Sequence, residues 1–205
     1  LGLTLSGAAA IPAADSRKKV MAQLSGRRIV EMVRDNLTID KILTREAFEN
    51  AIMVNAAVGG SSNFIIHLLA IAGRIGVKLE LGDFDKIGSQ IPLLLNLMPS
   101  GKYLMEDFYY AGGLPVILNE LKDHLHKKVT TVTGKNHHDN IKGNTDCYNY
   151  DVIATYEKPL IPEAGCIVVK GNLALNGAVM KPSAATPALM KHKGRAVVLD
   201  RKSVV

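Results

Sequence analysis

Hydrophobic residues recur at helical spacing in two early stretches of the chain, residues 16–35 and 44–57. In the first stretch the apolar positions fall mainly on one face and the arginines and lysines on the other, which predicts an amphipathic helix. The second stretch begins with Thr44, whose hydroxyl can accept a hydrogen bond from a free backbone N–H of the first turn. Acidic residues follow in that turn, where the helix dipole favours them. We therefore expect two helices in this part of the chain.

The stretch NAAVGGSSNFIIHLLAIAGRIG, residues 55–76, joins a glycine pair to a long apolar run. Apolar residues cover every face of the expected helix, so we expect it to be buried on all sides, with His67 as a core residue. Gly76 suits its end, because glycine tolerates the left-handed conformation that often terminates helices. Polar side chains stand where the helix begins and can accept from its free N–H groups. These polar residues are Ser61, Ser62 and Asn63.

Short strands and helices alternate in the pattern from residue 77 to residue 125. One almost continuous apolar run ends at a proline–glycine turn signal and lies between helical stretches. Such a run is typical of a strand buried in a parallel sheet. The expected elements are strands over 77–81 and 91–97, and helices over 84–88 and 113–125.

The character of the chain changes at residue 126, where a polar, glycine- and asparagine-containing stretch begins. The neighbouring His137 and His138 would face opposite ways on a strand, so a loop suits them better than a metal pair. Beyond residue 150, short strands recur between turn signals, which predicts a small barrel or sandwich. The expected strands cover 165–171, 178–181 and 195–200. The predicted class is α/β, with an α/β domain over 1–125, a crossing loop over 126–150 and a β-barrel-like domain over 151–205.

Composition narrows the classes of function. The 205 residues carry a net charge of +6, but the basic residues are spread out and aromatic residues make up only 5%. This composition does not provide the basic and aromatic platform that binds single-stranded nucleic acid, so we expect no nucleic-acid partner. Every long apolar run has polar interruptions, so we expect no membrane partner either.

The two cysteines, Cys147 and Cys166, lie far apart and form neither a CxxC motif nor a zinc-ligand array. Free thiols indicate a reducing compartment, and the first residues lack the basic region of a secretory signal, so we expect a cytoplasmic protein. The chain starts without methionine and ends without an obvious terminator. We expect it to be a piece of a longer protein.

Two features could carry chemistry. The helix start after Gly59 can collect free N–H groups and the positive end of the helix dipole, which suits a carboxylate or phosphate; alternatively, the glycines only make a tight turn. Glu106 and Asp107 stand beside three tyrosines and could serve acid–base or metal chemistry. They could equally form the first turn of a helix, where the dipole favours acidic residues.

Five phrases, in order along nearly the whole chain, resemble the family of the dihydroxy-acid and phosphogluconate dehydratases, and within it the sugar-acid branch that includes the arabinonate dehydratases. One departure is Ser62, where the family usually has threonine. The phrases are SGRRIVEMV, ILTREAFENAIMVNAAVGGSSN, PSGKYLMEDFYYAGGLP, KGNLALNGAVMKPSA and KHKGRAVV.

The resemblance implies a hydro-lyase that removes water from a 2,3-dihydroxy acid and gives a 2-keto-3-deoxy acid. It also implies an iron–sulfur cluster as Lewis acid for the leaving hydroxyl, and a magnesium ion that holds the carboxylate and the C2 hydroxyl. Metal assistance is reasonable because hydroxide is a poor leaving group. The family further implies a small anionic substrate, a role in branched-chain amino-acid synthesis or sugar catabolism, and a homodimer or homotetramer.

The family's cluster cysteines, magnesium ligands and serine base are not found in this sequence. The resemblance therefore places the chain in the middle of such an enzyme: the end of the N-terminal α/β domain, the crossing, and the start of the C-terminal domain. We expect no catalytic and no metal-binding residue here, and no activity of the chain alone. The expected substrate contacts are Ser61, Ser62, Asn63, Glu106 and Lys181. The alternative is a non-catalytic anion-binding or scaffolding module of the same fold.

Overall fold

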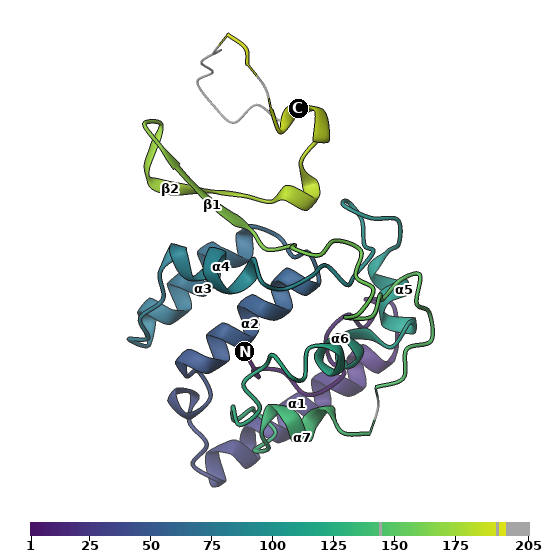
Figure 1. Ribbon diagram of the computed structural model, residues 1–205. Coiled ribbons are helices and arrows are strands. Elements are labelled where there is room, and N and C mark those ends of the chain that lie inside the picture. Colours follow the sequence, from purple (N-terminus) through teal and green to yellow (C-terminus); the bar gives the residue numbers. More distant parts are fainter. Residues whose placement is uncertain (144, 192, 196–205) are drawn as a thin grey trace.

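The computed structural model describes residues 1–143, 145–191 and 193–195, and it is rich in helices (Figure 1). No helix within these ranges combines the length and apolar character needed to cross a membrane. In chain order the elements are α1 (Arg17–Arg34), a 3-10 turn (Ile39–Lys41), α2 (Arg45–Ala57), α3 (Asn63–Arg74), α4 (Leu81–Gly88), α5 (Met105–Tyr110), α6 (Gly113–Glu120), α7 (His137–Ile141), β1 (Ile167–Gly171), β2 (Ala174–Met180) and two further 3-10 turns (Pro182–Ala184 and Pro187–Leu189).

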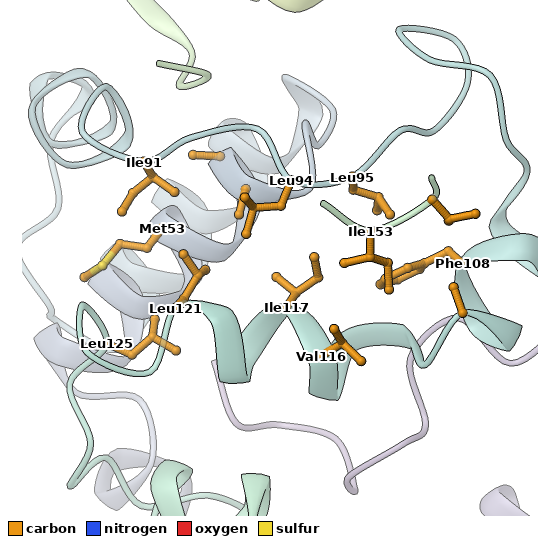
Figure 2. Close-up of a cluster of buried hydrophobic side chains, with 14 residues drawn as sticks. Met53, Ile91, Leu94, Leu95, Phe108, Val116, Ile117, Leu121, Leu125 and Ile153 are labelled. Carbon is orange, nitrogen blue, oxygen red and sulfur yellow. The ribbon is translucent and has the colours of Figure 1, made fainter. Parts of the chain in front are cut away.

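Helix α2 is the central element, because both hydrophobic cores pack against it. It begins after Thr44, whose hydroxyl accepts from the N–H of Ala47 at 3.4 Å, as the sequence predicted. The first core joins α2 to α6 and to two extended segments, one before and one after the polar crossing (Figure 2). Its most deeply buried members include Leu94, Ile117 and Ile153. Residues after 150 therefore complete the core of the helical part.

The second core joins α2 to α3 and α4, with Phe48 fully buried at its centre. The prediction that the helix after Gly60 is buried on all sides was wrong. Only Ile65, Leu68 and Ala72 of the fully described helix α3 are buried, whereas Ile66 and His67 are exposed. Helix α3 packs one face against its neighbours and exposes the other face to solvent. The apolar composition of the helix therefore did not predict how much of it is buried.

The segment between α3 and α5 was also predicted only in part. Residues 77–80, all of them described, form no regular strand, and Leu81 already begins α4. Residues 91–97 are extended and largely buried, but they form no parallel sheet with another strand. They make isolated bridges instead, antiparallel to Ile153 and Ile161 and parallel from Leu97 to Tyr103. The expected helix over 113–125 ends at Glu120. The burial of residues 91–97 was predicted correctly, but the partners of Leu93 and Leu95 come from a distant part of the chain.

The crossing and the C-terminal part differ from expectation as well. His137 and His138 start the short helix α7 where a loop was predicted. In the described residues, β1 and β2 form a two-stranded antiparallel hairpin in which Ile167 pairs with Met180. The structure does not confirm a barrel, and the strand expected over 178–181 already begins at Ala174. Of the expected strand 195–200, all but the first residue lies outside the described residues.

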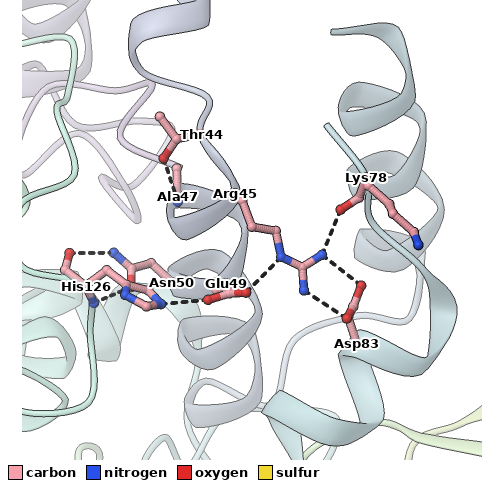
Figure 3. A network of polar contacts seen from close by, with 8 residues as sticks. All are labelled: Thr44, Arg45, Ala47, Glu49, Asn50, Lys78, Asp83 and His126. Carbon is pink, nitrogen blue, oxygen red and sulfur yellow. Dashed lines mark hydrogen bonds and ion pairs between the residues drawn. The ribbon is translucent and has the colours of Figure 1, made fainter. Parts of the chain in front are cut away.

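A polar network holds α2 to its neighbours (Figure 3). The Arg45 guanidinium donates to both carboxylate oxygens of Asp83 in α4, at 2.8 and 2.9 Å, and to Glu49 at 2.8 Å. Glu49 also contacts the His126 ring at 2.7 Å, and the buried Asn50 side chain bonds both the N–H and the C=O of His126. These contacts fix α4 and the start of the crossing relative to α2.

Candidate functional site

The turn between α2 and α3 is built from two glycines with different packing constraints. Gly59 has a φ of +59°, which favours glycine, and a Cβ there would lie 2.8 Å from the Leu93 side chain. Gly60 lies directly against the side-chain amide of Asn55, so any larger residue would displace that amide. Close packing therefore explains the glycine pair, which favours the simpler of the two interpretations, a tight turn.

The three polar residues after the turn have unequal roles. The Ser61 hydroxyl accepts from the backbone N–H of Asn63 at 3.2 Å and so acts as a local cap. Ser62 occupies the N-cap position of α3, but among the described contacts its side chain makes no capping hydrogen bond. Ser61, Ser62 and Asn63 are all exposed. Within this described region, the Ser62 hydroxyl and the Asn63 amide remain available to a ligand.

Lys181 is brought to this turn from the C-terminal part of the chain. It directly follows β2, and its ammonium group donates to the carbonyl oxygen of Gly59 at 2.5 Å, over a sequence separation of 122 residues. Its charge also acts on the buried Cys166 thiol, where it opposes the rise in pKa that burial causes. The structure therefore places a partly buried cation against the turn that leads into Ser61.

Glu106 does not belong to this arrangement. It lies in the first turn of α5, which Figure 1 shows well separated from α3. The neighbouring Asp107 accepts from the N–H of Leu104 at 2.8 Å and caps α5. The interpretation of this acidic pair as a helix first turn is thus supported, and the structure does not bring Glu106 together with the other predicted site residues.

A cavity of about 460 Å³ beside the turn was missed in the sequence. It is lined mostly by apolar residues, together with Asn55 and Phe64 from either side of the turn and His137 from α7. Among the described residues, the buried Nδ1 atom of His137 has no hydrogen-bond partner, and burial lowers the pKa of this histidine to about 4. The sequence offered no signal for this cavity, since its walls come from widely separated segments.

The side chains of the described residues do not fit an iron–sulfur cluster or a magnesium site. Within those residues, no three His, Cys, Asp or Glu side chains are grouped so that they could hold a metal ion. Cys166 belongs to a hydrophobic core, and Cys147 contacts the carbonyl of Ile153 at 3.8 Å. Burial raises the pKa of both thiols, whereas metal-binding cysteines need the thiolate form. These residues by themselves therefore provide a site for neither group.

Comparison with known proteins gives matches along nearly the whole chain. Residues 1–140 match the model of the dihydroxy-acid/6-phosphogluconate dehydratase N-terminal domain, and residues 151–205 match the C-terminal domain of that family. The chain is 58% identical to an L-arabinonate dehydratase of Rhizobium leguminosarum and 54% identical to an L-arabonate dehydratase of Azospirillum brasilense. It is 44% identical to a dihydroxy-acid dehydratase of Ignicoccus hospitalis. Each match covers 98% of this chain but only 35–37% of the relative.

Proposed function

Because the chain belongs to the dihydroxy-acid/6-phosphogluconate dehydratase family, we propose that it forms part of a hydro-lyase that acts on a sugar acid. The reaction removes water from a 2,3-dihydroxy acid and leaves a 2-keto-3-deoxy acid. The higher identity to the two arabinonate dehydratases than to the dihydroxy-acid dehydratase supports a sugar acid as substrate. The chain spans only about a third of the length of these relatives. The proposed activity is therefore that of the whole protein to which this chain belongs.

The contact between Lys181 and the Gly59 turn is the observation that carries a role for this segment. The ammonium group has three N–H donors, and one of them bonds the Gly59 carbonyl. We infer that a substrate carboxylate accepts one of the remaining donors and also meets the exposed Ser62 hydroxyl, which follows Gly59 by three residues. We therefore assign Lys181, Ser61, Ser62 and Asn63 to substrate contact, and we no longer include Glu106.

The cofactors are proposed to be held by other parts of the whole protein. The chain has two cysteines, both in packed positions, so a cluster would need ligands from elsewhere. In the proposed enzyme, such a cluster and a magnesium ion supply Lewis-acid chemistry at the leaving hydroxyl and at the carboxylate. The residues of this chain contribute binding and orientation.

The first test is an assay of the 205-residue chain with L-arabinonate, in parallel with the full-length protein. We expect formation of the 2-keto-3-deoxy acid by the full-length protein and no turnover by the chain alone. Turnover by the 205 residues would contradict the assignment of the reacting groups to other segments. A full-length protein that binds the sugar acid without turnover would favour the alternative, a non-catalytic anion-binding module.

The second test replaces Lys181 in the full-length protein. Lys181→Met keeps the length of the side chain but removes the charge, and we expect kcat/KM to fall about 10- to 100-fold, the range of one charge-assisted hydrogen bond. Lys181→Arg should retain part of the activity because the charge remains. Glu106→Gln is the matched control and should leave kcat/KM unchanged. Equal activity of Lys181→Met and wild type would remove Lys181 from the site.

A further inference from the structure

The cavity beside the turn between α2 and α3 has no part in the proposed reaction. Its walls come mainly from residues 1–9, α2, α6 and α7, and all the residues that line it are described. Its volume of about 460 Å³ lies within the range of about 300–1,000 Å³ that is typical of small-molecule sites. The cavity is therefore large enough to hold a ligand, and the chemistry of its walls determines the class of that ligand.

The lining of the cavity carries almost no charge. None of its lining residues, all of them described, is Asp, Glu, Lys or Arg. The ionisable groups are the imidazole of His137 and the amino group of Leu1, and burial lowers their pKa values to about 4 and about 6. Both groups are therefore mostly uncharged at neutral pH. An ion that entered the cavity would lose its hydration without gaining an opposite charge, so the cavity favours a neutral molecule.

The polar residues of the wall differ in whether the protein already satisfies them. The Thr131 hydroxyl accepts from the Asn140 amide at 2.7 Å, and the Asn50 amide bonds the backbone at the start of the crossing. In contrast, the buried Nδ1 atom of His137 has no partner among the described residues, although buried polar atoms normally have one. Nδ1 of a neutral imidazole either donates or accepts. A hydroxyl group can do both, so it satisfies this atom in either tautomer.

We propose that the cavity binds a small neutral alcohol, a molecule with an apolar body and one hydroxyl group that bonds Nδ1 of His137. The apolar body packs against Val54, Phe64 and Leu118, which line the cavity from three different helices. The proposed substrate of the enzyme is an anion with several hydroxyl groups, so this ligand belongs to another class. The cavity site is separate from the substrate contacts around Lys181, and the inference does not depend on the proposed reaction.

The test is binding of para-fluorobenzyl alcohol to the full-length protein, followed by fluorine NMR. We expect the probe signal to broaden with added protein and to give a Kd of about 1 mM or lower, as suits a ligand of this size. Benzoate has the same ring but carries a charge, and it should not displace the probe. L-arabinonate should not displace it either, because the substrate binds elsewhere.

Substitutions in the cavity wall locate the probe. His137→Leu fills a similar volume without a hydrogen-bonding group, and it should weaken binding of the alcohol about fivefold, the effect of one hydrogen bond. His138→Leu is the matched control, because His138 is the next residue of α7 and does not line the cavity. Val54→Phe places a larger side chain in the cavity and should abolish binding. The circular dichroism of each variant shows whether it keeps the fold.

Several results would overturn the proposal. If the full-length protein binds no alcohol, another part of the whole protein or ordered water fills the cavity. Displacement of the probe by L-arabinonate would place it in the substrate site, and displacement by benzoate would contradict the preference for a neutral ligand. Equal affinity of His137→Leu and His138→Leu would remove His137 from the site. Undiminished binding to a folded Val54→Phe variant would place the probe outside the cavity.

Discussion

His137 illustrates at the scale of a single residue how burial changes chemistry. Its imidazole lines the cavity, and burial is the main cause of its pKa of about 4, against an ordinary value of 6.5. The folded protein therefore holds this histidine neutral at pH values where the unfolded chain already binds a proton. The stability that this neutral form contributes is complete above pH 6.5 and is lost as the pH falls from about 6.5 towards 4.

We predict that the free energy of unfolding falls by about 1–3 kcal/mol between about pH 7 and pH 5 because of this one group. His137→Gln should flatten that part of the pH profile, as measured by urea unfolding at both pH values. His67→Gln, at an exposed histidine of α3, is the matched control and should follow the wild type. An unchanged profile in His137→Gln would show that other groups set the pH dependence.

At the scale of elements, two glycines determine how the C-terminal part meets α4. Gly88 ends α4, and Gly165 lies against its backbone just before β1. A Cβ on Gly165 would lie 2.6 Å from the backbone nitrogen of Ser89. Because a backbone cannot rotate away as a long side chain can, the approach of these segments depends on the absence of a side chain at Gly165.

Gly165→Ala should therefore destabilise the protein by about 2 kcal/mol or more, through overpacking. Gly82→Ala provides the matched control, since Gly82 lies in α4 and a Cβ there would meet none of the described residues within 4 Å. Because alanine has a higher helix propensity than glycine, Gly82→Ala should stabilise the protein by about 0.5–1 kcal/mol. Chemical unfolding of both variants measures the difference. Equal stability of the two would mean that α4 and the segment at Gly165 can separate without cost.

At the scale of the whole molecule, stability is unevenly distributed. The helices around α2 share two cores, whereas the hairpin of β1 and β2 exposes Leu173 and Leu175 almost completely. A hydrogen bond of 3.3 Å from the Val168 N–H to Asp85 is one of the contacts that attach this hairpin to α4. A two-stranded hairpin has little stability of its own.

We predict that amides of β2 exchange with deuterium faster than those of α2, because the hairpin can open without unfolding the cores. Exchange measured by mass spectrometry on peptides covering Ala174–Met180 and Arg45–Ala57 tests this. Peptides from α6 serve as a second reference for the core. Equal protection of the hairpin and α2 would show that they unfold as one unit.

Part of the candidate site could be predicted from the sequence. The glycine pair, the polar helix start and Lys181 were each identified, but nothing in the sequence indicated that Lys181 contacts Gly59. Glu106 was predicted as a site residue on its chemistry alone, and the structure separates it from the others. The sequence did not predict that His137 and Asn55 line a cavity, because the cavity walls come from segments that are distant from one another in the sequence.

The sequence by itself determined the family and the start of α2, because the Thr44 cap and the acidic first turn of that helix act between near neighbours in the chain. Only the tertiary structure decided which faces are covered. It left α1 and one side of α3 exposed, and it paired Leu93 and Leu95 with residues after 150 instead of with a parallel strand. Burial and strand pairing are contacts between distant segments, so their partners are chosen by the packing of the whole chain.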